Sequence, residues 1–400
     1  MRDNDKRNSW RPATVAVHGG EQGGWPGGAT QVPIVNSVAF GYTDLDRWHR
    51  VALGEESGHI YSRNTNPTVE VFEEKVRLLE GGEAATSFAT GMAAISNVLW
   101  ALLKPGDRVV SITDSYGGTS RLFLDFLPRY GIETELVPTS DQDALDSAIS
   151  RGCQLVYLET PTNPTLKVVD VAHAAAQAHA VGATLVADNT FATPINQLPL
   201  SLGADLVVHS ATKFLGGHAD ALGGVVVGRR QLVEPIFHFR EINGATLAAD
   251  PAYLLIRGLK TLALRIRQQN HSALAIARFL EAHPAVQAVF YPGLESHDGH
   301  EVARRQMPGG FGGVLSFAPH GGFEAVRRIL PRLQLAHLAA NLGSVETVAG
   351  PPQTTSHVEL TEEGRHSLGI PEALIRYSVG IEDTADLIED LDQALHAVTR

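Results

Sequence analysis

One lysine in this sequence stands in a setting that suits covalent chemistry. The chain has only six lysines, and Lys213 is the one that follows an apolar stretch, 206–208, through His209-Ser210-Ala211-Thr212. Gly216-Gly217 comes soon after it. A lysine at the carboxyl end of a strand can reach a ligand, and burial frees its amine as a nucleophile for Schiff-base formation. We therefore predict Lys213 as the nucleophile, with the hydroxyls of Ser210 and Thr212 as donors to a phosphate.

The other five lysines have structural interpretations. Lys75 is predicted on a charged helix face, and Lys260 is predicted as a solvent-facing residue of a long helix. Lys6, Lys104 and Lys167 fall in a polar tail, in a turn and at the end of a loop. Their surroundings indicate no covalent role.

A carboxylate precedes Lys213 at the end of another apolar stretch. Residues 183–188 end in Asp188, which Asn189-Thr190 follows. Taken alone, Asp188 is as readily a helix or turn cap. Taken with Lys213, it matches the needs of pyridoxal phosphate, which requires a lysine for its aldehyde and a carboxylate that keeps its pyridine nitrogen protonated. The pair predicts this cofactor.

A strand-to-helix turn supplies a third element. Ala89-Thr90-Gly91-Met92 joins an apolar run to a helical pattern through a glycine. The start of a helix offers free N–H groups and the positive end of the helix dipole to an anion. The N–H groups of Gly91 and Met92 are therefore predicted donors to the cofactor phosphate.

Several other chemistries lack their sequence signatures. The sequence has no G-x-x-x-x-G-K and no G-x-G-x-x-G after a strand, which argues against nucleotide binding. Ser210-x-x-Lys213 has the S-x-x-K spacing of penicillin-recognising enzymes, but S-D-N and K-T-G are missing. No histidine pair has H-E-x-x-H spacing, and Cys153 is the single cysteine, so we predict no metal site.

Charge and hydropathy limit the kinds of partner that we expect. The net charge is −12 and no run of basic residues forms a patch, so nucleic acid and anionic membranes are not expected partners. No apolar run approaches the length of roughly 18 residues that a membrane span requires. The polar N-terminus, MRDNDKRNSW, lacks a secretory signal, so we expect a soluble, cytoplasmic protein.

Alternating patterns predict an α/β fold. Strands are expected at 84–89, 108–112, 133–137, 155–158, 184–187, 206–208 and 223–227, with helices at 92–103, 119–130, 141–150 and 171–180. This alternation is typical of a mainly parallel sheet with helices on both faces, whose ligands bind at the carboxyl ends of the strands.

Three segments divide the predicted chain. Residues 1–60 show no sustained periodicity and suit an arm that contacts a neighbouring subunit, and 61–255 form a large cofactor-binding domain. A long amphipathic helix is expected over 251–283. Residues 256–400 form a smaller α+β domain, with strands at 286–291, 313–317 and 375–379 and helices at 324–333 and 385–398.

An ordered set of motifs resembles one enzyme family. The motifs are Tyr61-Ser62-Arg63-x-x-Asn66-Pro67-Thr68, Gly91-Met92-Ala93-Ala94, Ser115-Tyr116-Gly117-Gly118-Thr119, Glu159-Thr160-Pro161-x-Asn163-Pro164, Asp188-Asn189-Thr190, Ser210-Ala211-Thr212-Lys213 and Arg376-x-Ser378-Val379-Gly380. From residue 12 to its end, the chain is similar to the Cys/Met-metabolism family of pyridoxal-phosphate enzymes, which includes cystathionine γ-synthase, cystathionine γ-lyase, methionine γ-lyase and the O-acylhomoserine sulfhydrylases. The resemblance implies an aspartate-aminotransferase-like fold (fold type I) and a homotetramer built as a dimer of dimers.

The resemblance also implies roles around the cofactor. Lys213 would carry the Schiff base and move protons, and Asp188 would hold the pyridine nitrogen. Tyr116 would stack on the ring, and Asn163 would lie beside the phenolic oxygen. The phosphate would be held by Ser210, Thr212, Gly91 and Met92, and by Tyr61 and Arg63 from the adjacent subunit.

Substrate contacts are implied at four positions. Arg376 would bind the α-carboxylate through a planar pair of donors. Asn341 and Tyr61 are further predicted substrate contacts. Arg121 matches an arginine that cystathionine-handling members place near the far polar end of the substrate, although it could instead pair with Asp125 one helical turn on.

Departures from the family pattern bear on the substrate. Methionine γ-lyases carry a cysteine where this chain has Gly118, and Ile60 replaces an acidic residue frequent in cystathionine-handling members. Asn341 stands where sulfhydrylases often have Asn. We expect γ-elimination or γ-replacement on a homoserine-derived amino acid with a polar γ-substituent. The alternatives are a γ-lyase for methionine or canavanine, a β-lyase or aminotransferase, and a cofactor-binding regulator, for which no DNA-binding element is visible.

Overall fold

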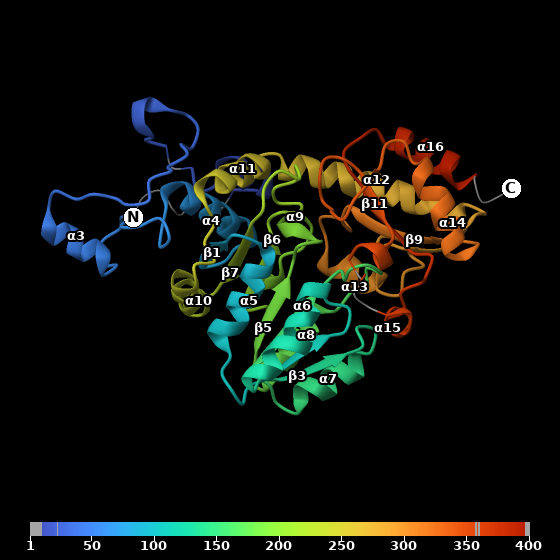
Figure 1. Cartoon of the computed structure of the whole chain (residues 1–400), viewed down its shortest axis with the longest axis horizontal. Coiled ribbons are helices and arrows are strands. Elements are labelled where there is room, and N and C mark those ends of the chain that lie inside the picture. The colour runs from blue at the N-terminus through green and yellow to red at the C-terminus, as the bar shows by residue number, and fades with distance from the viewer. Residues whose placement is uncertain (1–9, 22, 357, 359–360, 397–400) are drawn as a thin grey trace.

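Two β-sheets organise the chain, one of seven strands and one of five. The structure, a computed structural model, describes residues 10–21, 23–356, 358 and 361–396. The five-stranded sheet lies toward one end of the long axis and the seven-stranded sheet nearer its middle (Figure 1), and the long helix α12 (Leu262–Ala282) runs along the five-stranded sheet. None of the helices in the described ranges is long and apolar enough to cross a membrane.

The seven-stranded sheet has the order β1-β7-β6-β5-β4-β2-β3. Its strands are β1 (Ala84–Phe88), β2 (Arg108–Ile112), β3 (Glu133–Val137), β4 (Leu155–Glu159), β5 (Thr184–Asp188), β6 (Leu206–Ser210) and β7 (Gly224–Gly228). β2 to β6 pair in parallel, and only β7 runs against its neighbours. β4 and β7 are buried along their whole length, as continuous apolar runs are in a sheet covered on both faces. The predicted strands and α/β class are confirmed.

Helices cover both faces of this sheet. They are α4 (Pro67–Glu80), α5 (Gly91–Leu102), α6 (Gly117–Arg121), α7 (Gln142–Ser150), α8 (Val171–Ala180), α9 (Thr193–Asn196) and α10 (Arg230–Asn243). One apolar core joins α5 to Tyr157 and Val208, and another joins α7 and α8 to Val156 and Leu185. The predicted helix 119–130 is instead α6 followed by a π-helical turn, Leu122–Phe126, and a 3₁₀ turn, Leu127–Tyr130.

The five-stranded sheet has the order β10-β11-β12-β9-β8. Its strands are β8 (Val286–Phe290), β9 (Val314–Pro319), β10 (His337–Leu338), β11 (Val348–Gly350) and β12 (Ile375–Ser378), and its helices include α13 (His300–Gln306), α14 (Gly322–Ile329), α15 (Glu362–Ser367) and α16 (Thr384–Leu395). β10 and β11 are two and three residues long, too short for a periodic pattern to reveal them.

The predicted long helix 251–283 is wrong as a single element. The structure has α11 (Ala249–Leu259) and α12, with Lys260 and Thr261 between them. Arg265 donates from Nη2 to the carbonyl of Gly258 at 2.9 Å and from Nε to the hydroxyl of Thr261 at 3.0 Å. A side chain therefore satisfies the carbonyl at the end of α11, and the backbone is free to turn.

Part of the predicted arm packs on its own chain. Helix α2 (Pro12–His18) presents the carbonyls of Ala16 and Val17 to Lys75 Nζ at 3.1 and 3.0 Å, and Glu21 completes this site at 3.1 Å. Lys75 is fully buried, so its predicted charged face is wrong. Lys260, predicted in solvent, binds the same Glu21 at 2.9 Å.

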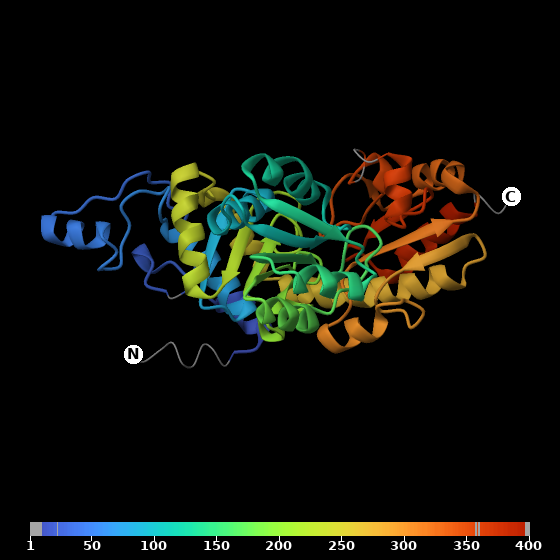
Figure 2. The same ribbon diagram turned by 90° about the horizontal axis from the view of Figure 1, so that it is seen from below.

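The rest of the predicted arm projects from the body of the molecule. Helix α3 (Leu45–Ala52), which Asp44 caps through its side chain, stands apart from both sheets in two perpendicular views (Figures 1 and 2). The segment exposes the apolar side chains of Val38, Leu45 and Trp48. Its contact with a neighbouring subunit, and the domain boundaries at residues 60 and 255, stay predictions.

Candidate cofactor and substrate site

Lys213 lies where the two sheets meet. It follows β6 by one turn, and its Nζ donates to Oδ1 of Asn341, between β10 and β11, at 2.9 Å. Burial, with a smaller contribution from the positive charge of Arg376, lowers the pKa of Lys213 to about 8. About a tenth of the amine is therefore neutral at about pH 7, and the neutral form is the one that a nucleophile requires.

Arg376 is a buried cation that faces polar groups but no acid. It lies on β12, and it donates from Nη1 to Asn163 Oδ1 and from Nη2 to the carbonyl of Asn341, each at 3.0 Å. Within the described part of the chain, no carboxylate forms an ion pair with it. Burial lowers the pKa of Arg376 to about 10. An uncompensated buried guanidinium favours an anionic ligand, because a buried charge without a counter-charge is costly.

Asp188 ends β5 with both carboxylate oxygens held. Thr190 donates its backbone N–H to Oδ1, and the hydroxyl of Tyr157 donates to Oδ2, each at 3.0 Å. Burial and the charge of Asp188 raise the pKa of Tyr157 well above its usual range, so this hydroxyl keeps its proton. The Asp188 carboxylate is thus oriented by a side chain of β4 and by the backbone of the turn that follows β5.

Tyr116 is positioned through a second buried acid. Its backbone N–H donates to Oε2 of Glu159 at 2.7 Å, and the residue is 44% exposed. Glu159 is the register partner of Asp188 on the adjacent strand. Burial, followed by the charge of Asp188, raises the pKa of Glu159 well above its usual range.

The predicted phosphate donors come together at the start of α5. Thr90 caps this helix by accepting from the N–H of Ala93 at 3.0 Å, while the N–H groups of Gly91 and Met92 have no partner among the described residues. A Cβ added to Gly91 would lie 2.6 Å from Cβ of Ser210, so the absence of a side chain lets these two segments meet.

Thr212 is close to this turn but already engaged. Its hydroxyl accepts from the N–H of Gly223 at 3.0 Å and donates to the carbonyl of the same residue at 3.3 Å. A role for Thr212 at the phosphate requires one of these contacts to give way, and it stays a prediction.

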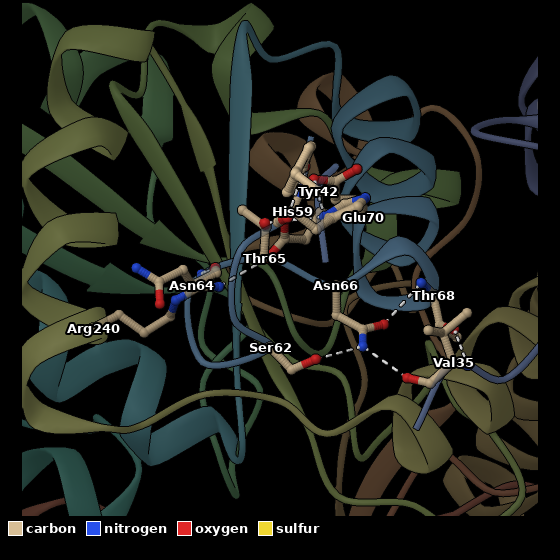
Figure 3. A network of polar contacts seen from close by, with 11 residues as sticks. Val35, Tyr42, His59, Ser62, Asn64, Thr65, Asn66, Thr68, Glu70 and Arg240 are labelled. Carbon is tan, nitrogen blue, oxygen red and sulfur yellow. Dashed lines mark hydrogen bonds and ion pairs between the residues drawn. The ribbon is translucent and has the colours of Figure 1, made fainter. Parts of the chain in front are cut away.

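Tyr61 and Arg63 are exposed on a turn before α4 and bind none of the residues above. The guanidinium of Arg63 lies 5.6 Å from the centre of the Tyr61 ring and donates to the carbonyl of Glu241 at 2.7 Å. Figure 3 shows the polar network behind this turn, in which Asn66 binds Ser62, Val35 and Thr68. These residues are predicted to contact the cofactor phosphate of a neighbouring subunit. Their exposure is consistent with this role, which remains a prediction.

Arg121 forms the alternative contact that its spacing predicts. Its Nε pairs with Oδ2 of Asp125 one helical turn on, and its side chain is 54% exposed. The substrate contact of Arg121 stays a prediction.

Two supporting residues were not predicted. Tyr157, which holds Asp188, and Glu159, which holds Tyr116, lie on β4. Glu159 belongs to a motif recognised in the sequence, but the motif does not disclose its contact. Tyr157 is the single aromatic residue in the apolar strand Leu155–Glu159, and that hydroxyl was the available signal.

The donor set fits pyridoxal phosphate. The cofactor needs an amine that reaches a neutral state, a fixed carboxylate for its ring nitrogen, and amide donors for its phosphate. Lys213, Asp188 and the Gly91–Met92 turn provide each of these. Among the described residues, no three His, Cys, Asp or Glu side chains are grouped to hold a metal ion.

A family comparison decides the assignment. The model of the family described as Cys/Met metabolism PLP-dependent enzyme matches residues 13–396. The chain belongs to this family. It is therefore a pyridoxal-phosphate-dependent enzyme, and the predicted cofactor is confirmed.

Individual members of the family are similar over nearly their whole length. The L-methionine gamma-lyase of Fusobacterium nucleatum subsp. polymorphum is 42% identical, with 96% of this chain and 98% of that protein covered. The cystathionine gamma-lyase of Bacillus subtilis (strain 168) is 44% identical, with 96% and 99% covered. The crystal structure of cystathionine gamma synthase from Xanthomonas oryzae pv. oryzae superposes with a TM-score of 0.92 at 38% identity, with 97% and 98% covered. The predicted fold type I architecture is confirmed.

Proposed function

We propose that this enzyme catalyses γ-elimination or γ-replacement on a homoserine-derived amino acid with a polar γ-substituent. The observation that carries the proposal is the pairing of a partly neutral amine, Lys213, with an uncompensated buried guanidinium, Arg376, through Asn341. Such a pair can hold the carboxylate of an amino acid while a base acts at its carbon atoms. The relatives named cystathionine gamma-lyase and gamma-synthase perform their chemistry on this same scaffold.

The residues have distinct tasks in this proposal. Pyridoxal phosphate, when bound, supplies the electron sink that acidifies the Cα–H bond of the substrate. Arg376 binds the α-carboxylate and so fixes the direction of that bond. Lys213 would take the proton from Cα and then a proton from Cβ, and the electron pair of that Cβ–H bond would form the Cβ=Cγ bond as the leaving group departs from Cγ with its own electron pair. Asp188 keeps the ring nitrogen protonated, with Tyr157 fixing its orientation.

The surroundings of Tyr116 bear on the methionine alternative. A Cβ at Gly118 would lie 2.9 Å from both Sδ of Met92 and Cε1 of Tyr116. Methionine γ-lyases carry a cysteine at this position, and its Cβ would require Tyr116 or Met92 to move. Methionine is nevertheless the second candidate substrate, because a relative at 42% identity is named for it.

A substrate panel tests the reaction. Purified enzyme is incubated with O-succinylhomoserine, O-acetylhomoserine, cystathionine, methionine and aspartate, with and without a thiol acceptor, and the 2-oxo acid, ammonia and thioether products are measured. We expect turnover of the polar homoserine derivatives above that of methionine. Preference for methionine would select the second candidate, pyruvate formed from cystathionine would select a β-lyase, and transfer of the amino group of aspartate to an added 2-oxo acid would select an aminotransferase.

Lys213→Ala provides the internal control. It should abolish the Schiff-base absorbance and the cofactor that borohydride fixes to the wild-type chain. Mass spectrometry should place the reduced cofactor on Lys213 in the wild type, and attachment to another lysine would contradict the assignment.

We also infer that the enzyme is a cytoplasmic homo-oligomer, a tetramer made of two active dimers. The exposed Tyr61–Arg63 turn and the projecting segment around Trp48 support this inference, because both keep large apolar or aromatic side chains exposed on the isolated chain. Sedimentation of the holoenzyme tests it. A fully active monomer would contradict it, and cell fractionation tests the location.

A further inference from the structure

Arg240 is a buried arginine that joins three separate segments. It lies near the end of α10 and is 3% exposed. Its Nη1 donates to Oε1 of Glu73 on α4 and to the carbonyl of Ser87 on β1, each at 3.0 Å. Its Nη2 donates to the carbonyl of Asn64 at 2.6 Å (Figure 3). These contacts connect the core of the chain to the turn that carries Tyr61 and Arg63.

Helix α10 forms two further hydrogen bonds with that turn. Asn64 Nδ2 donates to Oε1 of Glu241 at 2.6 Å, and Arg63 Nη1 donates to the backbone carbonyl of Glu241 at 2.7 Å. Residues 240 and 241 therefore set the position of residues 63 and 64. The last carbonyls of a helix carry partial negative charge, which favours the guanidinium of Arg63 at this end of α10.

The opposite side of the turn is fixed by Asn66. Its Nδ2 donates to the carbonyl of Val35 at 2.8 Å and to the hydroxyl of Ser62 at 3.0 Å, while its Oδ1 accepts from the N–H of Thr68 at 2.9 Å. With Asn66 on one side and α10 on the other, the backbone of the turn is held rigidly. The side chains of Tyr61 and Arg63 stay exposed.

We propose that Arg240 is a positioning residue for the active site of the neighbouring subunit. By holding Asn64, it presents Tyr61 and Arg63 at the geometry in which they meet the cofactor phosphate of the adjacent chain. This inference rests on the proposed oligomer, in which that turn completes a neighbour's site. The competing route stays within the chain, because Ser87 lies on the strand that leads to the turn at Gly91.

Cofactor affinity measures the effect without turnover. We expect Arg240→Gln to raise the dissociation constant of pyridoxal phosphate about tenfold or more, because a buried charged donor is lost at the turn. Glu73→Gln is the matched variant, since it removes the ion pair but leaves the Arg240–Asn64 bond, and it should have a smaller effect. Arg304→Gln, which breaks an exposed ion pair with Glu301, should have none.

Hybrid oligomers separate the two routes. Differently tagged Arg240→Gln and Lys213→Ala chains are co-expressed with the Lys213→Ala chain in large excess, and oligomers with both tags are purified, so that nearly every Arg240→Gln chain shares its active dimer with a Lys213→Ala chain. Each hybrid dimer then has one competent lysine, on the Arg240→Gln chain, and receives its Tyr61–Arg63 turn from a chain with an intact Arg240. We expect cofactor affinity and activity per competent lysine to return to within about twofold of a wild-type and Lys213→Ala hybrid, measured under the same conditions.

The reciprocal hybrid makes the opposite prediction. A wild-type chain paired with a chain carrying both Lys213→Ala and Arg240→Gln should show the weakened affinity, although its own Arg240 is intact. Impairment that follows the chain with the competent lysine in both hybrids would overturn the inference and assign Arg240 to its own site.

A separate variant keeps the inference distinct from the proposed oligomer. Tyr61→Phe combined with Arg63→Gln should weaken cofactor binding in the same partner-dependent way. Loss of the partner effect for both this variant and Arg240→Gln would mean that the turn does not serve a neighbour. A partner effect for this variant but none for Arg240→Gln would overturn the role of Arg240 alone.

Discussion

The hydrogen bond between Lys213 and Asn341 offers a direct way to change the pKa of the amine. Nζ of Lys213 donates to Oδ1 of Asn341 at 2.9 Å. Asn341→Asp would place a carboxylate at this distance and leave the hydrogen bond of Arg376 in place, because Arg376 binds the backbone carbonyl of residue 341 and not its side chain. The substitution therefore adds one negative charge beside the nucleophile without removing a backbone contact.

The expected change follows from the pKa of Lys213. With a pKa of about 8, roughly one-quarter of the amine is neutral at about pH 7.5. An opposite charge at hydrogen-bond distance raises a lysine pKa by about 1–3 units. The neutral fraction then falls to between about 3% and 0.03%, so capture of pyridoxal phosphate should slow by roughly tenfold to several hundredfold.

Stopped-flow absorbance of apo-enzyme mixed with pyridoxal phosphate measures this rate. Since the neutral amine reacts, the wild-type rate should rise with pH and reach half its maximum near the pKa of about 8. The Asn341→Asp profile should shift to higher pH by at least about one unit. Asn341→Leu, which removes the amide without adding charge, should leave the midpoint at or below that of the wild type. An unchanged midpoint in Asn341→Asp would refute the electrostatic reasoning.

Three further predictions address the remaining contacts. Arg376→Lys keeps the charge but loses the planar pair of donors, so KM for the amino acid should rise by about tenfold or more with a smaller change in kcat, and an unchanged KM would contradict carboxylate binding. Tyr157→Phe removes a hydrogen bond to charged Asp188 and should weaken cofactor binding by about tenfold in an absorbance titration, with wild-type affinity as the contrary result. Arg121→Ala should lower kcat/KM for substrates with a polar far end and spare short ones; a change below about threefold on both would leave Arg121 as a surface partner of Asp125.

The sequence predicted Lys213 and Asp188 because the local pattern around each residue indicates its place at the end of a strand. Lys213 and Asp188 each follow an apolar strand, and strand periodicity is a property of neighbouring residues. Parallel strands then bring their carboxyl ends to one edge, so proximity followed from the α/β class. The family motifs identified residues such as Asn163 and Arg376, which the structure brings together at 3.0 Å.

The buried supports could not be predicted because their contacts are distant in sequence. Glu73 and Glu74 beside Lys75 indicated a charged face, whereas Lys75 Nζ binds the carbonyls of Ala16 and Val17. Helical periodicity likewise continued through Thr261, where Arg265 ends α11 by binding a carbonyl. A local pattern describes a helix well, but it does not show which buried cation another segment will contact.

The alternation of side chains along a strand explains why contacts on the opposite face of the sheet support the candidate site. Successive side chains of a strand point to opposite faces, so the residue beside each functional group enters the opposite layer. His209, next to Ser210, lies with Nε2 2.6 Å from Oε1 of buried Glu80, and Asn189, next to Asp188, donates to the same oxygen at 2.9 Å. One carboxylate of α4 thus fixes the ends of both β5 and β6. Because neither strand end can move without breaking this contact, Glu80 helps to set the spacing between Asp188 and Ser210 from the opposite face of the sheet.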